Sequence, residues 1–162
     1  MTYYKMILKT IFYIALFFVL LDILLGIHRM YRRYYKYKEA LLLSKTKDKK
    51  LLVIGDPYSG FASKNIMKTY DCGDICLDLN GCDKCENSIK GDVLDELKKM
   101  KDNEYVIYES CVLEYVDKNR LDEVNKEIQR VSGGDYIDVR IKPNILPLTH
   151  YIFELGNIIL IF

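Results

Sequence analysis

The sequence is poor in several features that point to common classes of protein. It has only two histidines among 162 residues, His28 and His150, and their wide separation supports no catalytic triad. It contains no internal repeat and no low-complexity tract, and half of its residues are apolar, which argues against disorder. Its net charge is only +1. A length of 162 residues allows one domain plus an appendage.

The small net charge hides a division between two parts of the chain. Residues 1–50 carry 11 Lys and Arg against 3 Asp and Glu, a net charge of +8, which leaves −7 for residues 51–162. Proteins that hold nucleic acid phosphates do so with clustered Lys and Arg. We therefore expect a basic membrane-side segment, an acidic soluble domain and no binding of nucleic acid.

An apolar run near the N-terminus predicts a membrane anchor. Residues 11–27 are interrupted only by Asp22, and Met6–Leu8 lengthen the run to about 20 residues, enough to cross a hydrocarbon core of ~30 Å. Asp22 either reaches the headgroup interface or marks a site inside the membrane. The run is not followed by a small-residue cleavage site, so we expect a retained anchor at residues 6–28, with a buried core helix as the alternative.

The charges beside this run predict its orientation. Two lysines precede it, whereas five cations follow it, and the side richer in Lys and Arg stays in the cytoplasm. The cations that follow are Arg29, Arg32, Arg33, Lys36 and Lys38. We expect a single-pass membrane protein with a basic and aromatic juxtamembrane linker at residues 29–49 and a cytoplasmic domain at residues 50–162.

The soluble part is organised around L-L-V-I-G-D-P-Y-S-G, residues 51–60. Four apolar residues fit a buried strand, a Gly-containing turn follows, and a helix is expected from Phe61 to Tyr70. In open α/β sheets, ligands bind beyond the carboxyl ends of such strands. The turn Gly55–Gly60 is therefore predicted to form the floor of a binding site.

Further strands and helices alternate along the rest of the chain. This alternation predicts an α/β fold with an open, mainly parallel sheet and helices on both faces. Strands are expected at 51–54, 74–79, 89–92, 105–108 and 136–141, and helices at 61–70, 93–100 and 121–131.

Three common motifs do not fit the first turn. A phosphate-binding P-loop needs Lys and a hydroxyl residue where Phe61 and Ala62 stand. A dinucleotide fingerprint needs a second glycine where Pro57 stands, and a serine hydrolase would need its nucleophile at that same position.

The soluble part resembles the class I S-adenosylmethionine-dependent methyltransferases, which have a Rossmann-like fold, over most of residues 50–142. Five segments match the family's motifs in the family's order. They are V-I-G-D-P-Y-S-G at 53–60, Asp78 after the second strand, Gly91-Asp92 after the third, V-I-Y-E-S-C-V-L-E-Y-V at 106–116, and E-I-Q-R-V-S-G-G at 127–134.

The resemblance implies a binding site for S-adenosylmethionine. The first turn would pack under the methionine part, Asp78 would accept hydrogen bonds from the ribose hydroxyls, and Asp92 would face the adenine amino group. The residues expected at the cofactor are Gly55, Asp56, Pro57, Gly60, Asp78, Leu79 and Asp92. Both aspartates have an alternative role as an ordinary turn acid or helix N-cap.

The methyl acceptor is expected beside the end of the fourth strand. Glu109, Ser110 and Cys111 lie there, and one of them could orient the acceptor or, for Glu109, take its proton. Alternatively, the three residues cap the strand and pack against the next helix.

Five cysteines form a second group of interest. Their odd number and their spacing do not match a disulfide framework, so we expect reduced thiols. Cys72, Cys76, Cys82 and Cys85 could bring four thiolates to one zinc ion. The alternative is that Cys76 is a small buried apolar residue in its strand.

The sequence thus predicts a membrane-anchored methyltransferase that acts on a small molecule or a lipid. The alternative is a catalytically inactive module of the same fold, tethered to the membrane and binding a protein partner.

Overall fold

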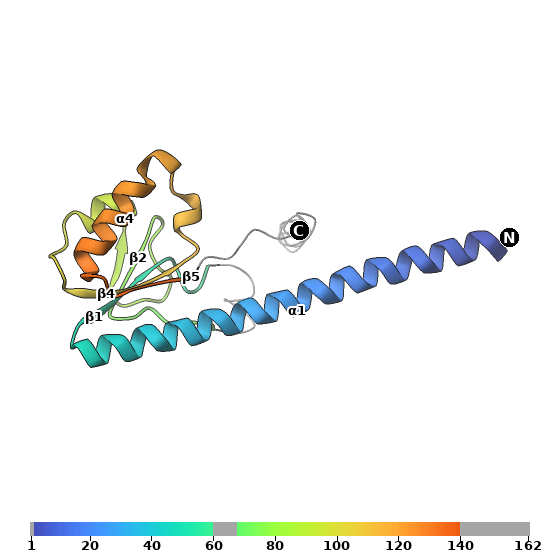
Figure 1. Ribbon diagram of the computed structural model, residues 1–162, viewed down its shortest axis with the longest axis horizontal. Helices are drawn as coiled ribbons and strands as arrows, with labels where there is room; N and C mark the ends of the chain where they lie inside the picture. Colours follow the sequence, from blue (N-terminus) through green and yellow to red (C-terminus); the bar gives the residue numbers. More distant parts are fainter. Residues whose placement is uncertain (1, 60–67, 140–162) are drawn as a thin grey trace. The chain divides into compact units, whose positions relative to one another are not determined.

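A parallel five-stranded sheet combined with helices makes up the soluble part of the protein (Figure 1). The computed structural model describes residues 2–59 and 68–139. The chain divides into two compact units, one of residues 1–31 with 143–162 and one of residues 32–142. The α/β class and the parallel sheet predicted from the sequence are therefore confirmed.

The first element, α1, is a helix at Thr2–Lys47. It contains a stretch that is long and apolar enough to cross a membrane, and none of that stretch is buried among the described residues. A core helix of a soluble domain would instead bury such side chains. The helix thus has the length and composition predicted for the anchor, while the side chain of Asp22 lies outside the described part.

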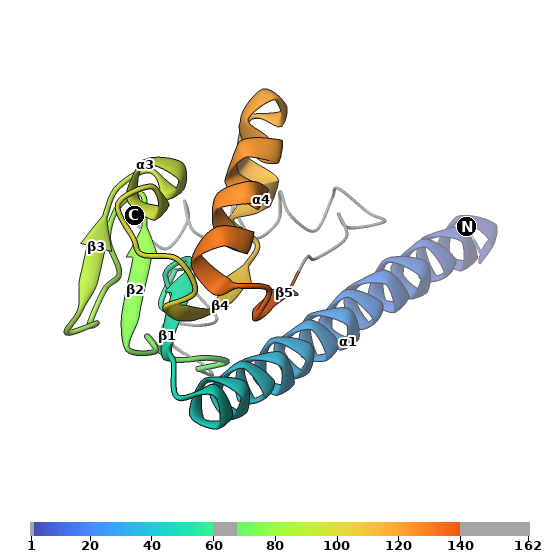
Figure 2. The ribbon, with the colours of Figure 1, turned by 60° about the vertical axis from the view of Figure 1, so that its left-hand side comes forward.

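The sheet has the strand order β3-β2-β1-β4-β5, with every neighbouring pair parallel (Figure 2). β1 lies in the middle, and its Leu52 is in register with Ile75 of β2 and with Ile107 of β4. The strands are β1 at Lys50–Ile54, β2 at Ile75–Asp78, β3 at Ser88–Lys90, β4 at Tyr105–Ser110 and β5 at Tyr136–Val139.

Alternate residues of the central strands belong to two separate apolar clusters. Leu52, Ile54 and Ile107 pack with residues of α3 (Val93–Leu97) and α4 (Lys118–Ser132). The next cluster contains Leu51, Val53, Val106 and Tyr108, which pack with Tyr37 and Ala40 of α1. Strands that are buried on both sides need continuous apolar runs, which explains why β1 and β4 read as L-L-V-I and Y-V-I-Y.

α4 is longer at both ends than the helix predicted at 121–131, and a capping residue marks each end. Asp117 caps the start, its side chain accepting a hydrogen bond from the backbone N–H of Asn119 at 2.9 Å. Gly133 ends the helix with a left-handed φ of 64°. A Cβ at this glycine would clash with the side chain of Asn103, which would have to move, and the left-handed φ disfavours any other residue.

The segments around β1 differ in part from the predictions. Residues 68–70 of the helix predicted at 61–70 are not helical, and its other residues lie outside the described part. Residues 32–47 continue α1 and belong to the same unit as the sheet, although the sequence predicted a linker at 29–49. The amphipathic pattern is hard to recognise there because, of residues 32–47, only Tyr37 and Ala40 are buried apolar residues, and they stand among many cations and exposed tyrosines.

Tyr37→Ala tests whether this part of α1 belongs to the folded unit. The ring of Tyr37 is 8% exposed and lies 5.4 Å from the ring of Tyr108 and 6.2 Å from that of Tyr70. Deleting a buried aromatic ring leaves a cavity, so we expect a loss of about 3 kcal/mol in the free energy of unfolding, measured by urea titration of the full chain in micelles. Tyr35→Ala is the control, because Tyr35 is 64% exposed and should change this free energy by less than about 0.5 kcal/mol. Equal losses in the two variants would contradict the packing described.

Candidate functional site

The candidate site lies at the carboxyl ends of the parallel strands, and β1, β2, β3 and β4 contribute to it. The chain runs outward from β1 through β2 to β3 and then returns to β4 on the other side of β1. At such a reversal the loops on the two sides diverge and leave a crevice, which is where open α/β sheets bind ligands. A pocket of about 420 Å³ lies there, within the usual range for small-molecule sites.

Most of the residues predicted to bind a cofactor or acceptor line this pocket. The lining includes Gly55, Asp56, Asp78, Leu79, Asp92, Ser110 and Cys111. Pro57 and Glu109 do not line it, and Gly60 lies outside the described residues. The lining also includes residues that the sequence analysis did not assign to the pocket, among them Arg33, Tyr70 and Arg120.

Gly55 allows the loop after β1 to approach the loop after β4. Its backbone N–H donates to the carbonyl of Leu77 at 2.9 Å, and its φ is +105°. A Cβ at this position would lie 2.8 Å from the side chain of Val112 and 3.3 Å from the carbonyl of Ser110. Any other residue would strain the backbone and push the two loops apart, so the pocket requires glycine here.

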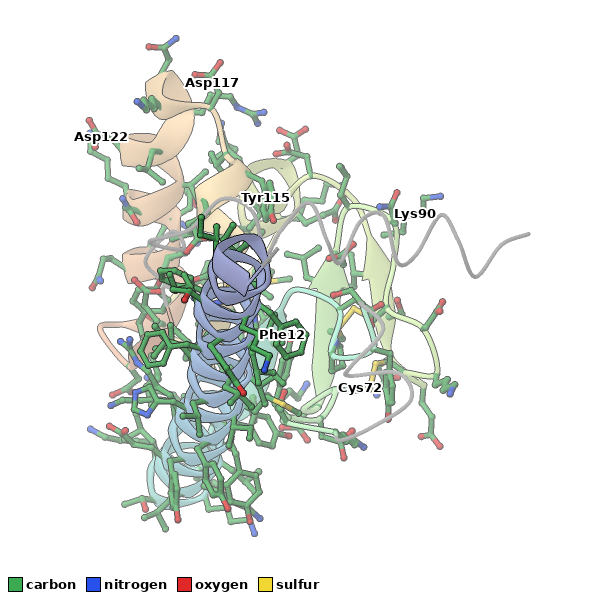
Figure 3. All side chains as sticks on the ribbon, turned by 90° about the vertical axis from the view of Figure 1, so that its right-hand side faces the viewer. Phe12, Cys72, Lys90, Tyr115, Asp117 and Asp122 are labelled. Carbon is green, nitrogen blue, oxygen red and sulfur yellow. A yellow bond between two sulfur atoms is a disulfide. The ribbon has the colours of Figure 1, made fainter. Side chains whose placement is uncertain are left out.

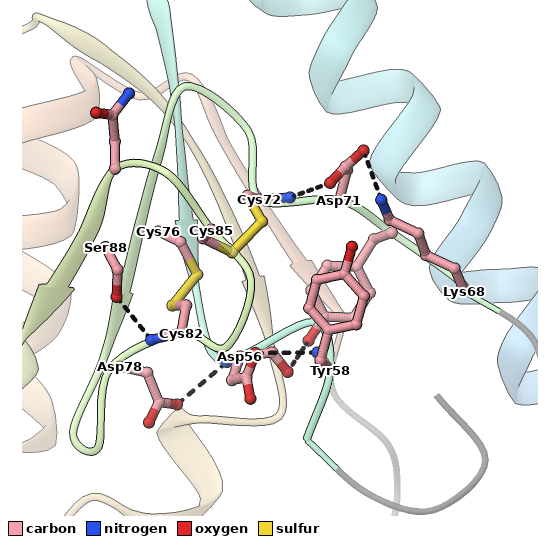
Figure 4. Close-up of a disulfide and its surroundings, with 12 residues drawn as sticks. Asp56, Tyr58, Lys68, Asp71, Cys72, Cys76, Asp78, Cys82, Cys85 and Ser88 are labelled. Carbon is pink, nitrogen blue, oxygen red and sulfur yellow. Dashed lines mark hydrogen bonds and ion pairs between the residues drawn. A yellow bond between two sulfur atoms is a disulfide. The ribbon is translucent and has the colours of Figure 1, made fainter. Parts of the chain in front are cut away.

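Asp78 ends β2 next to this glycine. One carboxylate oxygen accepts from the backbone N–H of Asp56 at 3.1 Å (Figure 4). The other accepts from the backbone N–H of Asn80 at 2.9 Å. A carboxylate has about four acceptor positions, so Asp78 can still accept hydrogen bonds from a ligand. Its side chain therefore both fixes the first turn and lines the pocket.

Asp92 is engaged in two ways. It is the N-cap of α3, accepting from the backbone N–H of Leu94 at 3.0 Å. It also forms a two-pronged ion pair with the guanidinium of Arg120, at 2.8 and 3.1 Å. Burial works against ionisation, but the hydrogen bonds from Arg120 and from the backbone of Asp95 and Leu94 leave the pKa of Asp92 below its usual range. The N-cap alternative is thus realised in the structure, and the carboxylate remains at the pocket wall.

Glu109 points into the protein. Its side chain is fully buried and accepts hydrogen bonds from the backbone N–H groups of Val112 and Leu113, which holds the turn after β4. Burial, together with the neighbouring carboxyl group of Asp138, raises the pKa of Glu109 to about 8. At neutral pH this acid is therefore mostly protonated, and its position matches the capping alternative.

The turn after β4 presents Ser110 and Cys111 to the pocket. Cys111 has a left-handed φ of 64°, which is uncommon outside glycine and often accompanies functional sites. Its sulfur accepts from the guanidinium of Arg33 at 3.2 Å and lies 3.4 Å from the carbonyl of Val139. Tyr115 and Asp117 follow on the segment that leads into α4, and both line the same pocket (Figure 3).

The other four cysteines are joined in two disulfides, Cys72–Cys85 and Cys76–Cys82 (Figure 4). The expectation of reduced thiols at these positions is therefore wrong for the structure. The reason is that the loop after β2 folds back, with the N–H of Cys82 donating to the Ser88 hydroxyl at 2.7 Å, and this brings together cysteines whose sequence spacing carried no such signal.

The same cluster keeps the geometry of a metal site. The sulfur atoms of Cys76, Cys82 and Cys85 lie within 4.8 Å of one another. Zinc binds thiolates, however, and a sulfur in a disulfide is not available as one. Zinc binding by the four cysteines therefore stays a prediction for the reduced protein.

Comparisons of the chain with protein-family models, with curated proteins and with solved structures find no match. The site is accordingly interpreted from its own geometry.

Glu109→Gln is expected to change how stability depends on pH. The acid has an ordinary pKa of 4.5 and a folded-state pKa of about 8, so between these values the folded chain binds more protons than the unfolded chain. The free energy of unfolding should therefore fall as pH rises from about 4.5 to about 8. Glutamine keeps an acceptor for the turn and a donor for Asp138, so the variant should lose this part of the slope. Glu114→Gln, at an exposed position, should keep it, and urea titrations at several pH values measure both.

Mapping of the cysteines distinguishes the disulfides from a zinc site. We expect a non-reduced digest, analysed by mass spectrometry after alkylation, to give the linked pairs Cys72–Cys85 and Cys76–Cys82, with Cys111 alkylated. Two results together would contradict the disulfides and support the zinc prediction. All five cysteines would be alkylated, but only after metal removal, and elemental analysis would find one zinc per chain.

Proposed function

We propose that this protein is a membrane-anchored, S-adenosylmethionine-dependent methyltransferase that acts on a small-molecule or lipid acceptor. Its sheet would be Rossmann-like, with α3 and α4 on one face and α1 on the other. The strand order β3-β2-β1-β4-β5 is the order of the first five strands in a doubly wound nucleotide-binding sheet, which supports the proposal.

A single observation carries the proposal. Gly55, Asp78 and Asp92 follow three successive strands and line one pocket, in the order that the methyltransferase motifs require. The residues fit the cofactor chemically, since Asp78 has acceptor capacity for ribose hydroxyls. The absent side chain of Gly55 lets Val112 pack against the first turn, which brings the loop after β4 to the pocket. Asp92 would face the adenine amino group while it stays paired with Arg120.

The bound cofactor would supply an electrophilic methyl group on a sulfonium. An in-line displacement of this methyl group from the sulfur would ask little acid or base help of the protein. The main task of the protein is to hold the two reactants in line, which is worth roughly 7–11 kcal/mol of the barrier. Ser110 and Cys111 would lie on the acceptor side, whereas the buried Glu109 would support them from behind.

The cytoplasmic position of the domain is a proposal on which two physical rules disagree. The excess of Lys and Arg after the span favours a cytoplasmic domain, as proposed from the sequence. Disulfides, in contrast, persist in oxidising compartments and are reduced in the cytosol. Cysteine mapping on protein isolated from cells under alkylating conditions therefore also tests the cytoplasmic orientation.

Binding of S-adenosylhomocysteine to the full chain in micelles, measured by calorimetry, tests the function. Asp78→Asn removes the charge but keeps an acceptor for the turn, and a hydrogen bond to a charged group is worth about 1.5–3 kcal/mol. We therefore expect the affinity to fall roughly 10- to 150-fold. Asp95→Asn is the control, because Asp95 is exposed on α3 and outside the pocket.

Two results would count against this proposal. No binding by the wild-type chain at millimolar ligand would favour the alternative of an inactive, membrane-tethered interaction module. An unchanged affinity in Asp78→Asn would reject the ribose assignment alone.

A further inference from the structure

Arg33 is a cation in the pocket wall without an acidic partner among the described residues. It comes from α1, in the same unit as the sheet, and its side chain is half-buried. One terminal nitrogen donates to the sulfur of Cys111 at 3.2 Å, and its Nε is buried with no hydrogen-bond partner. A guanidinium stays charged at any physiological pH, so this charge must be stabilised in some other way.

Two other arginines in the unit of the sheet form ion pairs with acidic side chains, which is the usual way to stabilise such a charge. Arg120 pairs with Asp92, and Arg130 pairs with Asp102 and Glu127. Arg33 instead donates to Cys111, and the other side chains that act on its charge are those of Tyr70 and Tyr108. Withdrawing an unpaired charge from water is costly, so a folded chain retains one in a pocket wall mainly when a ligand supplies the opposite charge.

Four acids line the pocket, and none of them forms a described ion pair with Arg33. Asp56, Asp78 and Asp92 lie at the ends of β1, β2 and β3, and Asp117 caps α4. The contact of Arg33 is instead with the turn after β4, at the side of β5. An anionic group placed at Cys111 would therefore meet a fork of donors. Planar guanidinium groups bind carboxylates and phosphates by two parallel hydrogen bonds.

We infer that Arg33 is the receptor for an anionic group, a carboxylate or a phosphate, of a ligand bound in this pocket. The inference rests on the proposed function only for the first of two sources, the amino-acid carboxylate of S-adenosylmethionine. The second source is the phosphate of an acceptor such as a lipid. Arg33 is the sixth residue after Ile27, the end of the apolar run, a chain length of at most about 20 Å, so a lipid headgroup is within the reach of this wall.

The test compares Arg33→Gln with the wild-type full chain in micelles of a neutral detergent. Calorimetry is done with three probes: S-adenosylhomocysteine, 5′-methylthioadenosine, which lacks the amino-acid group, and inorganic phosphate. Arg32→Gln is the matched control, because Arg32 is the exposed neighbour on the same helix.

Two results support the anion site and identify its source. If the carboxylate is bound, Arg33→Gln should weaken S-adenosylhomocysteine roughly 10- to 150-fold and leave 5′-methylthioadenosine unchanged. If an acceptor phosphate is bound, both nucleosides should bind as in wild type, and binding of inorganic phosphate should be lost.

Three results overturn the anion site. The first is that Arg33→Gln binds all three probes as wild type does. The second is that Arg32→Gln loses as much affinity as Arg33→Gln. The third is that wild type binds neither phosphate nor S-adenosylhomocysteine. Arg33-dependent binding of phosphate without any binding of the two nucleosides keeps the anion site and refutes the proposed methyltransferase.

Arg33→Lys keeps the test informative if circular dichroism shows that Arg33→Gln does not fold. Lysine preserves the charge but loses the planar fork. A several-fold loss of affinity for phosphate or S-adenosylhomocysteine, with 5′-methylthioadenosine unchanged, supports the inference. Wild-type affinity for all three probes refutes it.

Discussion

The arrangement of the pocket depends on the hydrogen bond between the N–H of Gly55 and the carbonyl of Leu77. It holds the first turn against the end of β2 at the point where the chain reverses direction across the sheet. The carboxylate of Asp78 reinforces the same junction through the N–H of Asp56. Because Val112 packs where a Cβ of Gly55 would be, the loop after β4 depends on this junction as well.

The pocket combines side chains whose hydrogen bonds hold the fold together with a side chain whose hydrogen bonds are incomplete. Asp78 and Asp92 each satisfy backbone N–H groups, so neither needs a ligand in order to be retained. Arg33 differs, because its described contacts satisfy only part of its guanidinium. A ligand is therefore needed most at the end of the pocket next to Cys111, and less at Asp78 and Asp92.

Features with a local cause could be predicted from the sequence. The run L-L-V-I before Gly55 specifies a doubly buried strand, and the parallel sheet then places the ends of β1, β2 and β4 together. What could not be predicted depends on contacts between distant segments. The disulfides need the loop after β2 to fold back, and the pair of Asp92 and Arg120 spans 28 residues. The sequence places Arg33 in a juxtamembrane linker, and its position in the pocket wall depends on the packing of Tyr37 and Ala40 with the sheet.

The packing of α1 against the sheet has a practical consequence for work without a membrane. Tyr37 and Ala40 cover the side of the sheet that contains Leu51, Val53 and Tyr108. Trimming the protein at residue 50 would uncover these side chains and create an apolar surface prone to self-association. A soluble version should instead start near Arg32, where the compact unit begins. This start removes the apolar run and keeps Tyr37 and Ala40 packed on the sheet.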